Sequence, residues 1–121
     1  MKKVNKGTLK RKADQAFAKF IRTRDGRCML QGMDEIICSP QLQCMHLMSR
    51  RNMRLRYDEV NCITGCSAHH TYYTYHPEEW MFLIHDKFPL HFNYIVDHRS
   101  EIVKVNEEYF REVIKNYQQN V

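Results

Sequence analysis

The chain has 121 residues, of which 43% are hydrophobic and 27% are charged, with a formal net charge of +5. This composition argues against intrinsic disorder, and at this length two independent cores would both be marginal. No run of residues approaches the ~20 apolar residues of a membrane helix or the apolar centre of a secretion signal. We therefore expect one globular domain over residues 1–121 that lies in the cytoplasm and does not bind a membrane.

The first predicted element is an amphipathic helix over residues 8–24. Apolar side chains recur there at helical spacing, and Asp25 followed by Gly26 supplies a stop signal. The basic residues that precede this segment, 1–7, are expected to form a flexible tail. The apolar stripe of the helix is expected to belong to the core, because such stripes usually do.

The middle of the chain predicts short strands and turns. Apolar runs at residues 35–38 and 42–45 predict a short strand pair, and a further strand is expected near residues 60–63. Between them, residues 47–59 are rich in arginine and lack a clear period, which predicts a loop. Gly65 then predicts a turn.

The remainder of the chain predicts four helices. Three of them are short and cover residues 67–75, 77–87 and 90–98, the second of these beginning with proline in its first turn. The last helix begins near Asn106, a favourable N-cap, and has two glutamates at its positive end. Together with the short strands, these helices predict a small α+β fold.

Charge is divided unevenly along the sequence. Residues 1–56 hold fourteen lysines and arginines against four acidic residues, whereas residues 57–121 hold five against ten. A concentrated basic region is typical of proteins that bind a polyanion, because each phosphate contact releases condensed counterions. Nucleic acid is the natural partner, and the alternative is a basic surface that is merely solvated.

Cysteine usage argues against a disulfide framework. The number of cysteines is odd, and no secretion signal precedes them, so reduced thiols or metal ligands are expected. The five cysteines are Cys28, Cys38, Cys44, Cys62 and Cys66.

Three residues in the segment 43–70 have the side chains that phosphodiester hydrolysis requires. In chain order they are His46, Asn61 and His70. Hydrolysis needs a base that deprotonates water and a cation that neutralises the growing charge, and histidine suits the first role because its ordinary pKa, about 6.5, lies near neutral pH. His46 is therefore the candidate base. His69 and His70 would point about 100° apart on a helix, so one should face the site and the other the interior.

The residues that carry a resemblance to a known family are spread over most of the chain. They are Lys12, Ala13, Asp14, Phe17, Ile21, Arg22, Arg24, Asp25, Cys28, Cys44, His46, Ser49, Arg50, Arg51, Arg56, Asn61, Cys66 and His70. In this order they resemble the NinG (Rap) phage recombination proteins, an HNH-like family. The resemblance implies a ββα-metal (HNH, or His-Me finger) centre, made of a hairpin and a helix and flanked by N- and C-terminal helices.

The same resemblance implies a metal-dependent DNA endonuclease. His46 would be the general base, Asn61 would brace the loop that carries it, and His70 would hold Mg²⁺ or Mn²⁺. Branched recombination intermediates are the implied substrate. A homodimer would suit the two-fold symmetry of such DNA.

Basic side chains near His46 are candidates for contact with the DNA backbone. Arg50 and Arg51 follow the histidine closely, and a planar guanidinium suits bidentate contact with phosphate. Arg54 and Lys12 are further predicted DNA contacts. Simple solvation of these side chains is the alternative.

Met45 departs from the family pattern. Many HNH proteins carry an acidic or histidine metal ligand at this position, and a thioether is a poor ligand for a hard cation. One protein ligand, completed by waters and phosphate oxygens, would then have to suffice. The departure leaves open a catalytically inactive HNH-like module that binds DNA without cutting it.

A second departure concerns structural zinc, which such proteins often hold with two Cys-x-x-Cys pairs. Cys28, Cys66 and His69 are candidate Zn²⁺ ligands, but Gln31 stands where a fourth ligand is expected and cannot serve. The fourth ligand would have to be one of the remaining cysteines, Cys38, Cys44 or Cys62. The alternative is a decayed site whose thiols pack as small apolar side chains.

Overall fold

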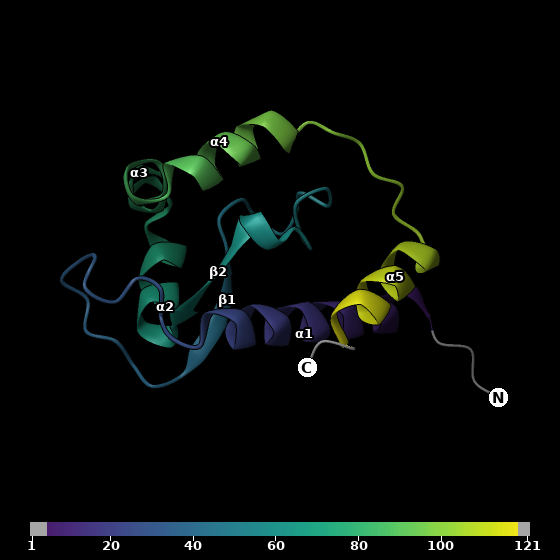
Figure 1. The fold of residues 1–121 in the computed structure, drawn as a ribbon, viewed down its shortest axis with the longest axis horizontal. Helices are drawn as coiled ribbons and strands as arrows, with labels where there is room; N and C mark the ends of the chain where they lie inside the picture. The colour runs from purple at the N-terminus through teal and green to yellow at the C-terminus, as the bar shows by residue number, and fades with distance from the viewer. Residues whose placement is uncertain (1–4, 119–121) are drawn as a thin grey trace.

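The structure, a computed structural model, describes residues 5–118 and shows a small α+β domain in which helices pack against one antiparallel hairpin (Figure 1). This confirms the predicted α+β fold class. The helices and strands of residues 5–118 are α1 (Lys6–Asp25), β1 (Leu42–His46), a 3₁₀ turn (Glu59–Asn61), β2 (Cys62–Cys66), α2 (Ser67–Tyr75), α3 (Pro77–Lys87), α4 (Pro89–His98) and α5 (Glu107–Gln118).

Helix α1 begins and ends at residues suited to those positions. The side chain of Asn5 accepts a hydrogen bond from the backbone N–H of Thr8, and Gly26 closes the helix with a left-handed φ of 70°. The helix therefore starts earlier than predicted: Lys6 and Gly7 belong to its first turn, not to a flexible tail. The rest of the predicted tail includes residues 1–4, which lie outside the described residues.

Helix α5 runs alongside α1 and covers its apolar stripe (Figure 1). Phe17 and Phe110 are both almost fully buried where these helices meet the hairpin. Asn106 receives a hydrogen bond from the backbone N–H of Tyr109, as the predicted N-cap should. None of the helices in the described part of the chain is apolar over enough length to span a membrane.

The hairpin lies between α1 and α2 and has an unambiguous register. Leu42 pairs with Cys66 and His46 pairs with Cys62, so alternate side chains of β1 point to opposite sides. Met45 belongs to the core formed with α2, whereas Cys44 packs against the core formed with α1 and α5. The hairpin thus separates two clusters of buried side chains.

Two local predictions are wrong. Residues 35–38 form no strand, because Asp34 turns the chain there by accepting the backbone N–H of Ile36. Gly65 lies inside β2 and makes no turn. A glycine is needed there because the side chain of Met45 fills the space that a Cβ atom would occupy.

The close approach of Met45 to Gly65 can be tested with Gly65→Ala. The added methyl group forces Met45 out of its buried position, so we expect the free energy of unfolding to fall by about 1–3 kcal/mol in chemical denaturation. The matched control is Gly7→Ala in the first turn of α1, where a Cβ meets nothing closer than 3.4 Å and should be neutral or stabilising. Equal destabilisation by both variants would contradict this account of Gly65.

Candidate active site and metal centre

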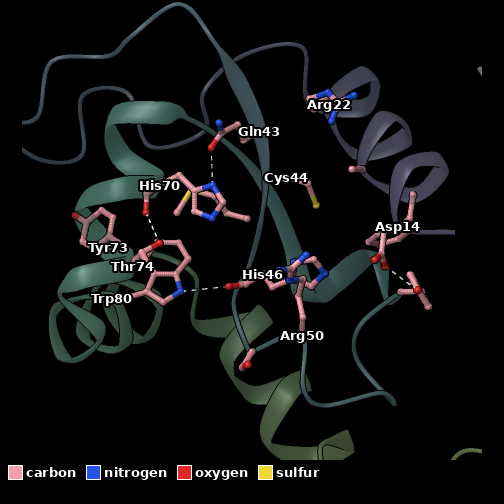
Figure 2. Close-up of a pocket in the computed structure, with 15 residues that line it drawn as sticks. Asp14, Arg22, Gln43, Cys44, His46, Arg50, His70, Tyr73, Thr74 and Trp80 are labelled. Carbon is pink, nitrogen blue, oxygen red and sulfur yellow. Dashed lines mark hydrogen bonds between the residues drawn. The ribbon is translucent and has the colours of Figure 1, made fainter. Parts of the chain in front are cut away.

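A cavity of about 550 Å³ lies between α1, β1 and α2 (Figure 2). It receives side chains from those three elements, from the loop after β1 and from the start of α3. The residues that line it include Asp14, Gln43, Cys44, Met45, His46, Arg50, Tyr57 and His70. The two histidines predicted to act together therefore border one cavity.

His46 stands at the end of β1 with its ring fixed by one hydrogen bond. Its Nε2 lies 2.9 Å from the backbone oxygen of Arg56. Because a carbonyl oxygen only accepts, Nε2 carries the proton and Nδ1 keeps its lone pair. Burial, together with the nearby positive charge of Arg50, lowers the pKa of His46 to about 4. The imidazole is neutral at pH 7, as a proton acceptor or a metal ligand must be.

Asn61 is fully buried and holds the loop that follows His46. Its side-chain oxygen accepts the backbone N–H of Met48, and its side-chain nitrogen donates to the backbone oxygens of Met48 and Leu55. The backbone oxygen of Asn61 also accepts the N–H of Leu47, at 2.7 Å. One amide side chain thus fixes the path of the chain immediately after the candidate base.

His70 reaches the cavity from the first half of α2. Its Nδ1 lies 2.6 Å from the side-chain oxygen of Gln43, so Nδ1 is the donor and Nε2 keeps a lone pair. Burial and the positive charge of Arg50 lower the pKa of His70. A neutral imidazole held through its other nitrogen is the usual form of a histidine metal ligand.

The two imidazoles approach the cavity from opposite sides of β1, as Figure 2 shows. The ring of His46 lies 6.4 Å from the ring of Phe17 in α1, whereas His70 contacts Gln43 on the side of α2. Met45 is 3% exposed and packs in the core, so it offers no ligand to a cation at His70. A substrate would have to span the width of the strand to meet both histidines.

An ion pair that the sequence did not predict fixes the far wall of the cavity. Asp14 accepts hydrogen bonds from Arg56 Nε and Nη2, at 2.9 and 2.7 Å, and from the hydroxyl of Tyr57. Burial opposes its ionisation, but these hydrogen bonds lower the pKa of Asp14 overall. Because Arg56 also supplies the carbonyl that holds His46, the ion pair positions the candidate base. Asp14 and Arg56 are among the residues that carry the family resemblance, and this was the one sequence feature that could have indicated their pairing.

The predicted DNA-binding side chains occupy different environments. Arg50 lines the cavity and Arg51 is exposed nearby. Arg54 instead lies 2.8 Å from Asp58 and 2.7 Å from Glu101, so its charge is used within the fold. Lys12 lies in a separate groove between α1 and α5, which is also basic. The four residues do not form one surface.

A second site gathers four potential metal ligands. The ligand atoms of Cys28, Cys38, Cys66 and His69 all lie within 4.8 Å of one another. Nδ1 of His69 is 3.0 Å from Cys66 Sγ and 3.7 Å from each of the other two sulfur atoms. Three sulfurs and one imidazole nitrogen around one point are a ligand set that zinc prefers.

The surroundings of His69 also suit a metal ligand. The ring is fully buried, and its Nε2 lies 2.8 Å from a carboxylate oxygen of Asp34. The other oxygen of Asp34 accepts the hydroxyl of Tyr73, at 2.7 Å. A carboxylate that receives the second ring N–H orients the imidazole and raises its basicity, as in carboxylate–histidine–zinc arrangements.

Sequence reasoning supplied three of these ligands, and the tertiary structure adds the fourth. Cys66 ends β2 and His69 lies in the first turn of α2, while the backbone N–H of Met29 bonds to Thr64 and brings Cys28 beside them. Cys38, from the irregular segment before β1, completes the set, whereas Gln31 is exposed. The spacing did not reveal Cys38 because the segment that carries it has no regular structure.

The thiols of Cys38 and Cys66 differ in pKa. Burial and the neighbouring Cys28 and Cys66 thiols raise the pKa of Cys38. Burial opposes ionisation of Cys66 too, but its hydrogen bonds with His69 bring the pKa of that thiol down to about 6. Without a cation, three sulfurs this close cannot all be thiolates, and a bound Zn²⁺ would remove that restriction.

Zinc content provides the test of this centre. We expect the purified protein to retain one zinc ion per chain through gel filtration, measured by elemental analysis, and Cys38→Ser to lose it. Asp34→Asn should keep the four ligands but weaken zinc affinity about 10–100-fold in competition with a chelator. Gln31→Ala is the matched control and should leave zinc binding unchanged. Full zinc occupancy in Cys38→Ser would contradict the assignment.

Comparisons of the chain with protein-family models, curated proteins and solved structures find no match.

Proposed function

We propose that the chain is a metal-dependent DNA endonuclease of the HNH (ββα-metal) type. One observation carries this proposal: His46 at the end of β1 and His70 in α2 border one cavity, and Asn61 holds the loop between the two strands. Strand, histidine, braced loop, strand and helix follow one another in the order of the HNH motif that the chain resembles.

The proposed reaction begins with proton transfer to His46. Nδ1 has the free lone pair, and the Arg56 carbonyl keeps the proton on Nε2, so Nδ1 can accept a proton from a water molecule at the cavity wall. That water would attack the phosphorus atom of the scissile linkage. The Asp14–Arg56 ion pair keeps the carbonyl in place while the imidazole changes charge.

His70 is the proposed protein ligand of the catalytic cation. Its Nε2 is unprotonated because Nδ1 donates to Gln43, and its lowered pKa keeps the ring neutral at pH 7. A bound Mg²⁺ or Mn²⁺ would stabilise the negative charge on the phosphate and the leaving oxygen. Magnesium commonly keeps several waters and prefers oxygen ligands, so waters and phosphate oxygens would have to supply the rest of its coordination shell beside this one imidazole.

Arg50 and Arg51 are the proposed phosphate contacts beside the cavity. Both side chains are exposed on the loop that Asn61 holds, and Arg50 also lines the cavity. The resemblance to the recombination proteins makes branched DNA the proposed substrate, and a homodimer acting in the cytoplasm would suit it. Arg54 is left out of the proposed DNA surface because its charge is paired with Asp58 and Glu101.

The Cys₃His centre would hold Zn²⁺ in a structural role. It joins two parts of the chain, namely the irregular segment between α1 and β1, which carries Cys28 and Cys38, and the junction of β2 with α2, which carries Cys66 and His69. That junction carries His69 and His70 side by side, one directed at the metal centre and one at the cavity. Zinc would thereby set the orientation of the helix that presents the catalytic cation's ligand.

An inactive DNA-binding module is the second candidate function. Met45 favours it, because this side chain is buried in the core where related nucleases place a ligand, which leaves His70 as the cation's one proposed protein ligand. Such a module would bind DNA through Arg50 and Arg51 without cutting it. The assays below separate the two functions.

Cleavage of branched and linear DNA with Mg²⁺ or Mn²⁺ tests the leading proposal. We expect His46→Ala to slow cleavage about 10²–10⁴-fold, the usual contribution of a general base. His70→Ala should raise the Mg²⁺ concentration needed for half-maximal rate. The matched control is His85→Ala on the exposed face of α3, which should cut at the wild-type rate.

Absence of cleavage under every metal, combined with DNA binding, would replace the nuclease by the inactive module. Cleavage that is equal in the wild type and in His46→Ala would overturn the role of His46. Cleavage that does not depend on a divalent cation would overturn the role of His70.

Salt dependence of DNA binding tests the assignment of the arginines. Arg51→Ala should weaken binding by a similar factor for all sequences and should reduce the slope of log affinity against log salt by about 1, as loss of one phosphate contact does. Arg54→Ala should leave that slope unchanged and instead lower thermal stability, because it releases Asp58 and Glu101 from their partner. The reverse pattern would show that Arg54 is the DNA contact.

A further inference from the structure

A second cluster of metal-binding side chains lies on the other face of the hairpin. The ligand atoms of Cys44, His46 and Cys62 all lie within 4.8 Å of one another. None of these residues belongs to the Cys₃His centre, whose ligands come from the segment before β1 and from the junction of β2 with α2. The two thiols therefore need a separate explanation.

The hairpin register creates this cluster. His46 pairs directly with Cys62, and Cys44 precedes His46 by two residues, so all three side chains project from the same face. Cys62 is fully buried beneath the strand pair, whereas Cys44 and His46 line the cavity. A ligand in the cavity could therefore reach Cys44 and His46, whereas Cys62 is fixed by the surrounding core.

The three atoms suit a thiophilic cation. Zinc lies about 2.3 Å from thiolate sulfur and about 2.0–2.1 Å from imidazole nitrogen, which places the ligands of a tetrahedral ion about 3.3–3.8 Å apart. Side chains whose atoms already lie within 4.8 Å can reach that spacing by small rotations. Two cysteines and one histidine leave the fourth position to water or to a ligand in the cavity.

The surroundings favour this arrangement as well. His46 donates from Nε2 to the Arg56 carbonyl, which leaves Nδ1 as the ligand and supplies the second hydrogen bond that orients a metal-binding imidazole. The hydrogen bond with Cys62 and the charges of Arg22 and Arg24 lower the pKa of Cys44, and Arg24 also donates to the backbone oxygen of Cys62, at 2.8 Å. Burial and the neighbouring Cys44 raise the pKa of Cys62, so a bound cation would have to displace the proton of that thiol.

We propose that Cys44, His46 and Cys62 form a regulatory site for Zn²⁺ or a similar thiophilic cation. Binding releases the two thiol protons to solvent and forms bonds from the ion to both sulfurs and to Nδ1 of His46. Nδ1 cannot accept a proton from water while it holds the cation. Mg²⁺ does not compete for this site, because it prefers oxygen ligands. Zinc would therefore switch off the base that the proposed nuclease requires.

The binding part of this inference does not depend on the nuclease proposal. It can be measured with Co²⁺, whose bonds to thiolates give a charge-transfer absorption band, added to the zinc-loaded protein in a non-thiol reductant. We expect the wild type to bind one Co²⁺ beyond its structural zinc, and Cys44→Ser and His46→Ala to bind at least tenfold more weakly. His85→Ala, on the exposed face of α3, is the control and should bind as the wild type does.

Equal Co²⁺ affinity in the wild type and in Cys44→Ser, with the structural zinc intact in both, would overturn the site. Circular dichroism and zinc content confirm that each variant is folded. Cys44→Ser is preferred to a change at Cys62 because Cys44 is only half-buried, whereas Cys62 is fully buried in the core.

The inhibitory part rests on the proposed function and has its own measurement. In the cleavage assay at fixed Mg²⁺, micromolar Zn²⁺ should slow the wild type, and at least ten times more Zn²⁺ should be needed to slow Cys44→Ser relative to its own uninhibited rate. Equal inhibition of both proteins would overturn the switch while leaving the binding result intact. If the chain cuts no DNA, the switch fails with the nuclease, and the Co²⁺ titration still decides whether the metal site exists.

Discussion

In the hairpin, His46 pairs with Cys62 and Leu42 pairs with Cys66, and a slip of one residue would turn every side chain of one strand to the opposite face. Both candidate sites depend on this register. It places Cys44, His46 and Cys62 together on the side of α1, and Gln43 and Met45 on the side of α2. The fit of Met45 over Gly65 helps to hold the register, because only glycine leaves room for that side chain.

The irregular segment between α1 and β1 is positioned by side-chain hydrogen bonds and by potential metal ligands, because it contains no helix or strand. Asp34 turns its backbone, receives Tyr73 and orients His69, while Cys28 and Cys38 from the same segment converge on that imidazole. A small domain buries a limited apolar area, and a metal centre adds stability where the core is thin. Zinc at this position would connect the segment to α2 and hence to the wall of the cavity.

Several arginines that raise the net charge of the chain hold the fold together. Arg56 is paired with Asp14 and Arg54 with Asp58 and Glu101, while Arg24 donates to backbone oxygens around β2. The number of basic residues in the sequence therefore overstates how many of them are free to contact DNA. Arg50 and Arg51 remain at or near the cavity, on the loop that Asn61 fixes, and this small set is where the charge and the candidate chemistry coincide.

The sequence alone indicated the two long helices, the N-cap of α5 at Asn106 and the stop of α1 at Gly26, since helical periodicity and these residues are local signals, but it did not indicate the N-cap of α1 at Asn5. It also indicated candidate site residues, because their order along the chain resembles that of a known family: His46, Asn61, His70, Cys28, Cys66 and His69. Their roles in function stay predictions. Only the tertiary structure decided that Cys38 joins the metal centre, that Asp14 holds Arg56, and that Arg54 is paired internally. These are contacts between residues far apart in the chain or in irregular segments, and neither periodicity nor spacing encodes which of several equivalent thiols or charges will meet.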